Sequence, residues 1–109
     1  MDKIQLTNDK RQRFRLIVGG QDVAVFLYLN TVDNHWYMDL FDFQGNEISL
    51  GKRIVDREFV LNFRKQGFLG NFYLMCDAAQ TLNEPIDLVN CRFYYLTERE
   101  VVEALNFGT

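Results

Sequence analysis

The sequence predicts a mainly β fold: a small antiparallel β-barrel or sandwich of six to eight short strands, with one short internal helix and a C-terminal helical tail. Three observations predict it. Apolar residues recur with a period of two along most of the chain, which is typical of strands. Gly, Asn and Asp separate these runs, as expected of hairpin turns. The period changes only after Asp56 and after Thr97, where helices are expected.

Two hairpins are predicted in the first half of the chain. Residues 12–18 alternate, and one face of this run and its flank carries four side chains: Arg11, Arg13, Arg15 and Ile17. Residues 19–22 predict a tight turn, because glycine tolerates the positive φ that such turns need. Residues 23–29 and 35–43 then form strands that are apolar on both faces, joined by a turn at residues 30–34.

Further short strands are expected at residues 4–6, 47–50, 54–55, 72–76 and 91–96. Gln44-Gly45-Asn46 predicts the hairpin turn before the second of these. Gly51-Lys52-Arg53 is expected to break the strand at residues 47–50, which then resumes at residues 54–55. A polar loop of residues 77–87 separates the last two strands.

An internal helix is expected after the strand at residues 54–55. Asp56 can cap it, and Phe59, Val60 and Phe63 then share a side. The helix is expected to end before Gly67.

A second helical segment is expected at the C-terminal end. Thr97 and Glu100 have the spacing of a capping box, in which each side chain satisfies a backbone N–H at the helix start. An apolar stripe then follows, formed by Val101, Val102 and Leu105. This segment is too short to be stable alone in water, so it must dock on its own domain or on a neighbour. We therefore divide the chain into a β domain at residues 1–97 and a helical extension at residues 98–109.

Composition excludes several classes of protein. Hydrophobic residues make up 48% and charged residues 25% of the chain, which is ordinary for a folded domain and excludes disorder. A run of 18 apolar residues is absent, so no transmembrane helix is expected. The N-terminal residues lack the basic start and apolar run of a signal peptide.

Reactive side chains are too few for a predicted active site. The single Ser, Ser49, lies in a strand, and the single His, His35, lies at a turn. Cys76 and Cys91 match no zinc or redox spacing, so we expect them to be reduced, small hydrophobic residues. We predict no catalytic residue, cofactor or metal site.

One carboxylate pair also fails as a catalytic site. Asp39 and Asp42 are three residues apart, and on a strand such residues point to opposite faces. We expect Asp42 to belong to the turn and Asp39 to make a structural polar contact or an interface contact.

The net charge of −3 is unevenly distributed. Five bases against two acids give +3 in residues 1–20, and two bases against six acids give −4 in residues 76–109. These regions can pair within one fold or between copies. The row of Arg11, Arg13 and Arg15 can be a solvated strand face, a protein interface or a nucleic-acid contact. Single-strand binding usually adds exposed aromatic residues, whereas the same-face neighbour on this strand is Ile17.

Aromatic residues are abundant, with ten Phe, five Tyr and one Trp. The strands at residues 23–29 and 35–43 are apolar on both faces, although an antiparallel sheet usually has one face in water. We therefore expect their second face to be covered by the helical segments or by other chains.

The most distinctive motif is Trp36-Tyr37-Met38-Asp39-Leu40-Phe41-Asp42 followed by Gly45. Leu27-Tyr28-Leu29-Asn30 precedes it, and Ile48, Gly51 and Ile54-Val55 follow. Looser matches are Phe14, Gly67 or Gly70, Asp77 and Tyr94-Tyr95-Leu96. This pattern, over roughly residues 4–97, resembles the cyanophage-type baseplate plug family of small phage baseplate proteins. The segment at residues 98–109 extends past the usual end of that family.

The resemblance implies a structural, non-enzymatic component of a contractile phage tail baseplate, near the tail axis at the hub or tube-initiating region. It implies several copies around that axis, contacting other baseplate hub and tail tube proteins. It also implies a place in the virion after synthesis in the host cytoplasm. No membrane, specific nucleic acid, small molecule or cofactor is expected as a partner.

The residues that match the motif are expected mostly to support the fold, Trp36 in the core and Asp42 and Gly45 in the hairpin turn. The remaining matches are Tyr37 and Asp39. The candidate interface residues are Arg11, Arg13, Arg15, Val101, Val102 and Leu105. The alternative hypothesis is a free-standing small β-barrel module that binds single-stranded nucleic acid or carbohydrate, supported by the aromatic content and the arginine row.

Overall fold

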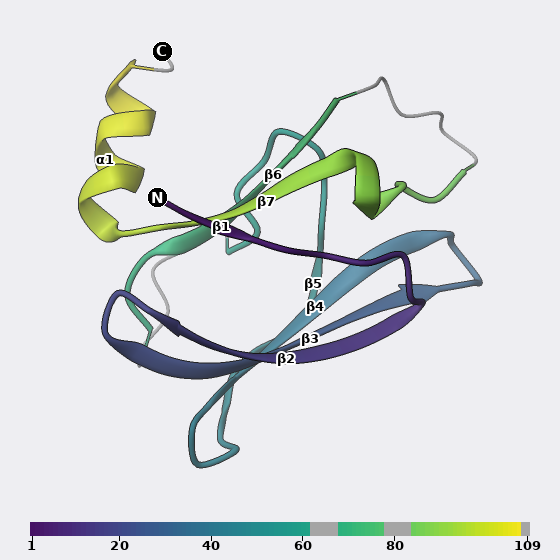
Figure 1. Ribbon diagram of the computed structural model, residues 1–109, viewed down its shortest axis with the longest axis horizontal. Coiled ribbons are helices and arrows are strands. Elements are labelled where there is room, and N and C mark those ends of the chain that lie inside the picture. Colours follow the sequence, from purple (N-terminus) through teal and green to yellow (C-terminus); the bar gives the residue numbers. More distant parts are fainter. Residues whose placement is uncertain (62–67, 78–83, 108–109) are drawn as a thin grey trace.

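A computed structural model describes residues 1–61, 68–77 and 84–107, which form two antiparallel sheets (Figure 1). The strands are β1 (Asp2–Ile4), β2 (Arg11–Val18), β3 (Gln21–Asn30), β4 (His35–Asp42), β5 (Glu47–Arg53), β6 (Asn71–Cys76) and β7 (Cys91–Leu96). One sheet has the order β1-β7-β6 and the other β2-β3-β4-β5. A short 3-10 helix, η1 (Leu88–Asn90), precedes β7, and α1 (Glu98–Phe107) follows it. The predicted mainly β class is confirmed.

The four-stranded sheet is a series of hairpins whose turns follow local chemistry. Val18 pairs with Gln21 across two glycines with positive φ, which is the backbone that a two-residue hairpin turn requires. Between β4 and β5, the Asp42 carboxylate accepts from the backbone N–H of Gln44 at 2.9 Å and of Asn46 at 2.8 Å. The Asp42 side chain therefore belongs to the turn.

The core lies between the two sheets. The four-stranded sheet contributes one face of β3 and β4, and the three-stranded sheet contributes one face of β6 and β7. Fully buried side chains from these faces are Val25, Leu27, Met38, Leu40, Phe72, Leu74 and Phe93. Three stacked or edge-on ring pairs join Phe68, Phe72 and Tyr95. The core therefore uses only one of the two apolar faces of β3 and β4.

A polar link also joins the sheets. The Gln21 amide at the start of β3 donates to the Leu69 carbonyl at 2.8 Å and accepts from the Leu69 N–H at 2.7 Å. The Tyr95 hydroxyl donates to the same carbonyl at 2.6 Å. Gly70 beside it has φ +99, and a Cβ there would lie 2.4 Å from the Leu96 carbonyl oxygen. This close packing requires glycine.

The predicted internal helix is wrong over the described residues 56–61. Phe59 instead forms an isolated bridge with Tyr73 of β6, and the Val60 N–H donates to the Phe72 carbonyl at 2.9 Å. Asp56 caps no helix; its carboxylate accepts from the Cys76 N–H at 2.8 Å. Phe59 and Val60, whose spacing suggested a helix, instead lie against β6. They do so because the edge of that strand offers free backbone N–H and C=O groups as hydrogen-bond partners. Phe63 and Gly67 lie outside the described residues.

The predicted break at Gly51 is also wrong. β5 runs through residues 51–53 as one strand, with register shifts against β4. Gly51 has φ +64, and its N–H donates to Asp39 at 2.7 Å. This irregularity bends the strand without ending it. Ile54 follows the strand, where its N–H donates to the Trp36 carbonyl at 2.9 Å.

The expectation of two reduced cysteines is wrong as well: Cys76 and Cys91 form a disulfide. The two residues end β6 and begin β7, and the antiparallel register places them directly opposite each other. Their spacing of 15 residues matches no known motif, because it reflects the length of the loop between two strands. The division of the chain into residues 1–97 and 98–109 stays a prediction.

Candidate functional site

The described residues offer no assembled catalytic centre. Ser49 is buried, and its hydroxyl has no hydrogen-bond partner among them. His35 lies beside Arg53, whose Nη2 is 2.8 Å from the histidine Nε2. Within residues 1–61, 68–77 and 84–107, no three His, Cys, Asp or Glu side chains are placed to hold a metal ion. None of the described helices is long and apolar enough to span a membrane.

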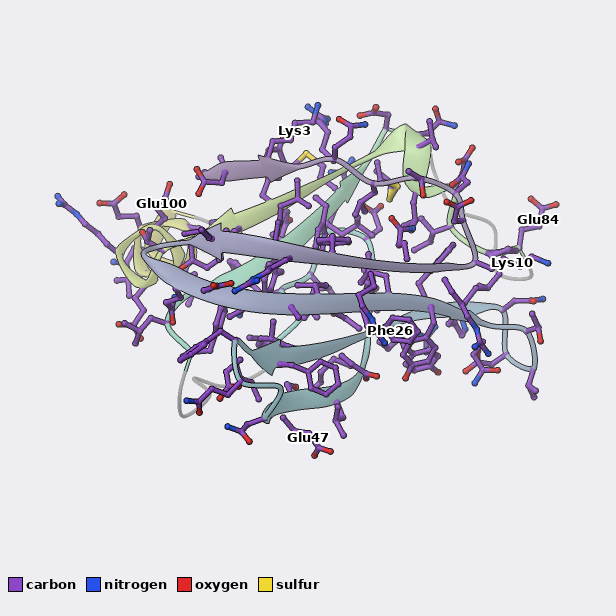
Figure 2. All side chains as sticks on the ribbon, turned by 60° about the horizontal axis from the view of Figure 1, so that its bottom comes forward. Lys3, Lys10, Phe26, Glu47, Glu84 and Glu100 are labelled. Carbon is purple, nitrogen blue, oxygen red and sulfur yellow. A yellow bond between two sulfur atoms is a disulfide. The ribbon has the colours of Figure 1, made fainter. Side chains whose placement is uncertain are left out.

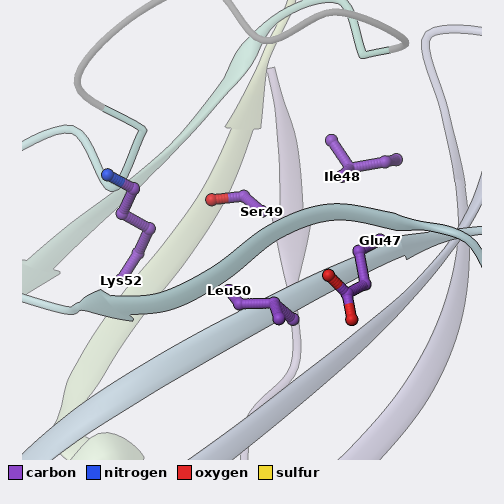
Figure 3. Close-up of a pocket in the computed structure, with 5 residues that line it drawn as sticks. All are labelled: Glu47, Ile48, Ser49, Leu50 and Lys52. Carbon is purple, nitrogen blue, oxygen red and sulfur yellow. The ribbon is translucent and has the colours of Figure 1, made fainter.

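A hollow of about 340 Å³ follows β5. Figure 3 shows that all of its labelled lining residues come from this one strand, and they are Glu47, Ile48, Ser49, Leu50 and Lys52. Ligand sites usually bring a few polar groups together from several elements around an apolar cavity. This hollow lacks that arrangement, so we do not assign it a ligand.

The most distinctive surface is the side of the four-stranded sheet that points away from β1, β6 and β7, which we call the outer face. Strand register places its residues in rows across the sheet. In one row, Arg11 lies opposite Tyr28, Tyr28 opposite Tyr37, and Tyr37 opposite Arg53. In the next row, Arg13 lies opposite Phe26, and Phe26 opposite Asp39.

Aromatic rings on the outer face stack beside the arginines. The ring centroids of Phe26 and Tyr28 are 5.4 Å apart, and those of Tyr28 and Tyr37 are 5.9 Å apart. The Arg13 guanidinium carbon lies 5.5 Å from the centre of the Phe26 ring, within cation–π range. Figure 2 shows the labelled Phe26 on the side of this sheet away from β1. The three rings are only half-buried.

These aromatic neighbours correct the interpretation of the arginine row. The sequence indicated Ile17 as the apolar neighbour of the arginines on their own strand, and Ile17 is indeed 76% exposed. The stacked rings come from β3, one strand away, and cross-strand neighbours are as close as neighbours along a strand. The aromatic residues Phe26 and Tyr28, which share one face of residues 23–29, were the available signal, but placing them beside the arginines required the register of β2 against β3.

The charges of the outer face are unequally paired. Arg15 donates to both oxygens of Asp22, at 2.8 and 2.6 Å, which holds the pKa of Asp22 below its ordinary value. The Tyr37 hydroxyl donates to Asp33 and similarly lowers the pKa of that carboxyl. Arg11 and Arg13, by contrast, form no ion pair with any residue that the structure describes.

The residues of the distinctive motif at residues 36–45 lie on both faces of the four-stranded sheet and in the turn after β4. Trp36 is buried in the core, where its Nε1 donates to the Ile86 carbonyl at 2.8 Å. Tyr37 and Asp39 lie on the outer face. Gly45, with φ +85, occupies the turn after β4 with Asp42.

The C-terminal helix α1 begins with the predicted capping box. The Glu100 N–H donates to the Thr97 hydroxyl at 3.2 Å, and the Thr97 N–H donates to the Glu100 carboxylate at 3.0 Å. The amino group of Met1 lies 2.5 Å from the other Glu100 oxygen. These contacts hold the first turn of the helix on the domain and lower the pKa of Glu100.

The rest of α1 stands largely in solvent. Val101 is half-buried, but Val102 and Leu105 are each 55% exposed. Figure 2 shows the helix at one end of the molecule, near the labelled Glu100 and far from Phe26. The candidate interface residues thus form two separate surfaces, arginines with aromatic rings on the outer face and the apolar stripe on α1.

Comparison with known proteins supplies one further observation. A family model described as cyanophage baseplate Pam3 plug gp18 matches residues 1–98 of this chain. Nearly all of α1 lies beyond the matched residues. No curated protein matches the chain.

Proposed function

The chain belongs to the cyanophage baseplate plug family, and from this membership we propose that it is a structural, non-enzymatic component of a contractile phage tail baseplate. It sits near the tail axis, at the hub or tube-initiating region. It acts there through contacts with other hub and tail tube proteins, in several copies around the axis. It becomes part of the virion after synthesis in the host cytoplasm.

The family match over residues 1–98 carries this proposal. The outer face supports it, because Tyr, Phe and Arg are enriched in the central parts of protein interfaces. Phe26, Tyr28 and Tyr37 are half-buried although they belong neither to the hydrophobic core nor to the side chains packed against it. A protein partner that covered these rings would remove their apolar surface from water.

Reconstitution tests the proposal. The full chain is mixed with the hub and tail tube proteins encoded in the same phage genome, and complexes are separated by size. We expect stable co-elution with at least one of them. The variant Tyr37→Ala should weaken it, whereas Val32→Ala, in the exposed turn between β3 and β4, should not. Failure of every hub and tube protein to bind the wild-type chain would exclude this function.

The aromatic rings beside Arg11 and Arg13 favour a second candidate, a small module that binds single-stranded nucleic acid. Arginines that follow the phosphates and rings that stack on bases are the usual combination for such binding. A fluorescent oligothymidine should then bind at low salt and lose affinity steeply as salt rises. Absence of binding at low salt would exclude this candidate.

A further inference from the structure

The outer face and the apolar stripe of α1 are both open surfaces in the described chain. The stripe exposes Val102 and Leu105 on a helix whose first turn is held by the capping box and by the Met1 amino group. The outer face exposes half-buried rings with Arg11 and Arg13 beside them. Each surface combines apolar and charged side chains. The outer face carries rings and arginines, and α1 carries the apolar stripe and glutamates, so the two surfaces are complementary.

The two surfaces cannot meet within one chain. α1 follows β7 in the three-stranded sheet, and its first turn is tied there by Thr97 and by the amino group of Met1. The outer face is on the far side of the four-stranded sheet, beyond the core. Contact between them therefore requires a second molecule.

We propose that α1 of one copy docks on the outer face of a second copy. The inference rests on the proposed function, because it explains how several copies associate around the tail axis. It assigns the apolar stripe to the rings of Phe26, Tyr28 and Tyr37, and the helix carboxylates to the arginines of β2.

The sizes of the two surfaces agree. A helix of ten residues is about 15 Å long at about 1.5 Å per residue. Four strands spaced about 4.8 Å apart span about 14 Å between the first and the last. One helix can therefore cross the sheet and cover the central rings. Recognition of an amphipathic helix by an apolar surface is a common mode of protein association.

The charges also agree. α1 carries Glu98, Glu100 and Glu103 against the single base Arg99. Glu103 lies 3.2 Å from Arg99, but this pair is largely exposed and therefore weak, so Glu103 can exchange partners. Arg11 and Arg13 have no acidic partner among the described residues. Docking would supply them with carboxylates that the described part of their own chain does not provide.

The contact joins two different surfaces, so a pair of copies retains one free outer face and one free α1. Such heterologous contacts form closed rings when the rotation between copies closes, and open chains when it does not. A ring of copies about the tail axis is therefore one arrangement that such a contact can form.

A charge-swap experiment on the full chain tests the contact. Sedimentation velocity measures self-association of the wild type, of Arg11→Glu with Arg13→Glu, and of Glu98→Arg with Glu103→Arg. We expect the wild type to self-associate, each charge reversal to weaken association at least tenfold, and a mixture of the two variants to recover most of it. Leu105→Asp should weaken association as strongly, while Asn46→Asp, in the distant β4–β5 turn, should not.

Thermal unfolding of each variant provides the folding control, because the substituted side chains are exposed or partly exposed. A monomeric wild-type chain, or reversals whose mixture recovers nothing, would overturn the inference. Loss of oligothymidine binding in the arginine variant, with self-association unchanged, would also overturn it and assign the outer face to nucleic acid. A monomer that still binds hub proteins leaves the proposed function standing, whereas self-association without hub binding contradicts that function alone.

Discussion

The two faces of β3 have similar apolar content but different surroundings. On the inner face, Val25 and Leu27 are completely buried against the second sheet. On the outer face, Phe26 and Tyr28 stack on each other and on neighbouring side chains but remain half in water. One strand therefore both stabilises the fold and presents an aromatic surface that folding alone does not require.

This difference indicates where substitutions should affect stability and where they should affect association. Apolar burial contributes free energy in proportion to the area removed from water, so the inner face dominates the stability of the monomer. The rings of the outer face are already partly in water, so unfolding exposes little further apolar area there. Binding of a partner would bury that area, and dissociation would expose it again. Substitutions on the two faces, and changes of redox state and pH, therefore test this distinction.

Substitution on the inner face should have the largest effect. Leu27→Ala leaves a cavity in the closed core and should lower the free energy of unfolding by about 2–5 kcal/mol. The neighbouring Phe26→Ala should cost about 1 kcal/mol, because it removes a ring stack and a cation–π contact at a half-exposed site. Urea denaturation of both variants measures the two values. Equal losses would remove the distinction between the faces.

Reduction of the disulfide should have the next-largest effect on stability. Cys76 is 1% exposed and belongs to the inner side of the three-stranded sheet. Crosslinking across a loop of this length restricts the unfolded chain and stabilises by about 3 kcal/mol. We expect denaturant midpoints to fall when a reductant is added and to be insensitive to reductant in Cys76→Ala/Cys91→Ala. A wild-type midpoint that does not change with reductant would contradict this expectation.

A substitution in the capping box should have a smaller and local effect. Thr97→Ala removes the hydroxyl that accepts from the Glu100 N–H and should destabilise α1 by about 1 kcal/mol. Because the helix rests mainly on β7, far-ultraviolet circular dichroism should show lost helix before the sheets unfold. Thr97→Ser keeps the hydroxyl and serves as the matched control. Helix content that is the same in both variants would argue against the cap.

Acid should produce the smallest effect, and it should act on the outer face and its turns. Arg15 lowers the pKa of Asp22, the Tyr37 hydroxyl lowers that of Asp33, and the Asn46 N–H lowers that of Asp42, all from an ordinary 3.8. A depressed pKa in the folded state stabilises the protein above the ordinary value. This contribution is lost as pH falls through the folded-state value.

Denaturant melts between pH 7 and pH 3 measure this loss. Asp22→Asn removes one of the three carboxylates, so its stability should fall less steeply below pH 4 than that of the wild type. An unchanged slope would show that Arg15 and Asp22 contribute nothing to the acid sensitivity.

Much of the fold could be predicted because its signals are local. The alternation of residues 12–18 and the glycines after them predict a strand and its turn, since both depend on neighbouring residues. The capping box at Thr97 and Glu100 is equally local and is confirmed. The errors lie where a distant segment decides the outcome. Phe59 and Val60 have a helical spacing, but the edge of β6 pairs with them instead.

For the candidate site too, features that lie on one element could be predicted and contacts between elements could not. The sequence alone identified the arginine row and the apolar stripe of α1, because each lies on a single element. It could not place Phe26, Tyr28 and Tyr37 beside those arginines, because that depends on the register of three strands.

Local sequence patterns suffice to predict the period of most strands, the positions of most turns and the capping of the final helix, because these depend on interactions within a few residues. Three outcomes depend instead on packing between distant segments: the pairing of Cys76 with Cys91, the conformation of residues 56–61, and the choice of which apolar face of β3 is buried. These outcomes depend on how strands distant in sequence align and on which sheet covers which face. Both are set by the summed burial and hydrogen bonding of the whole chain.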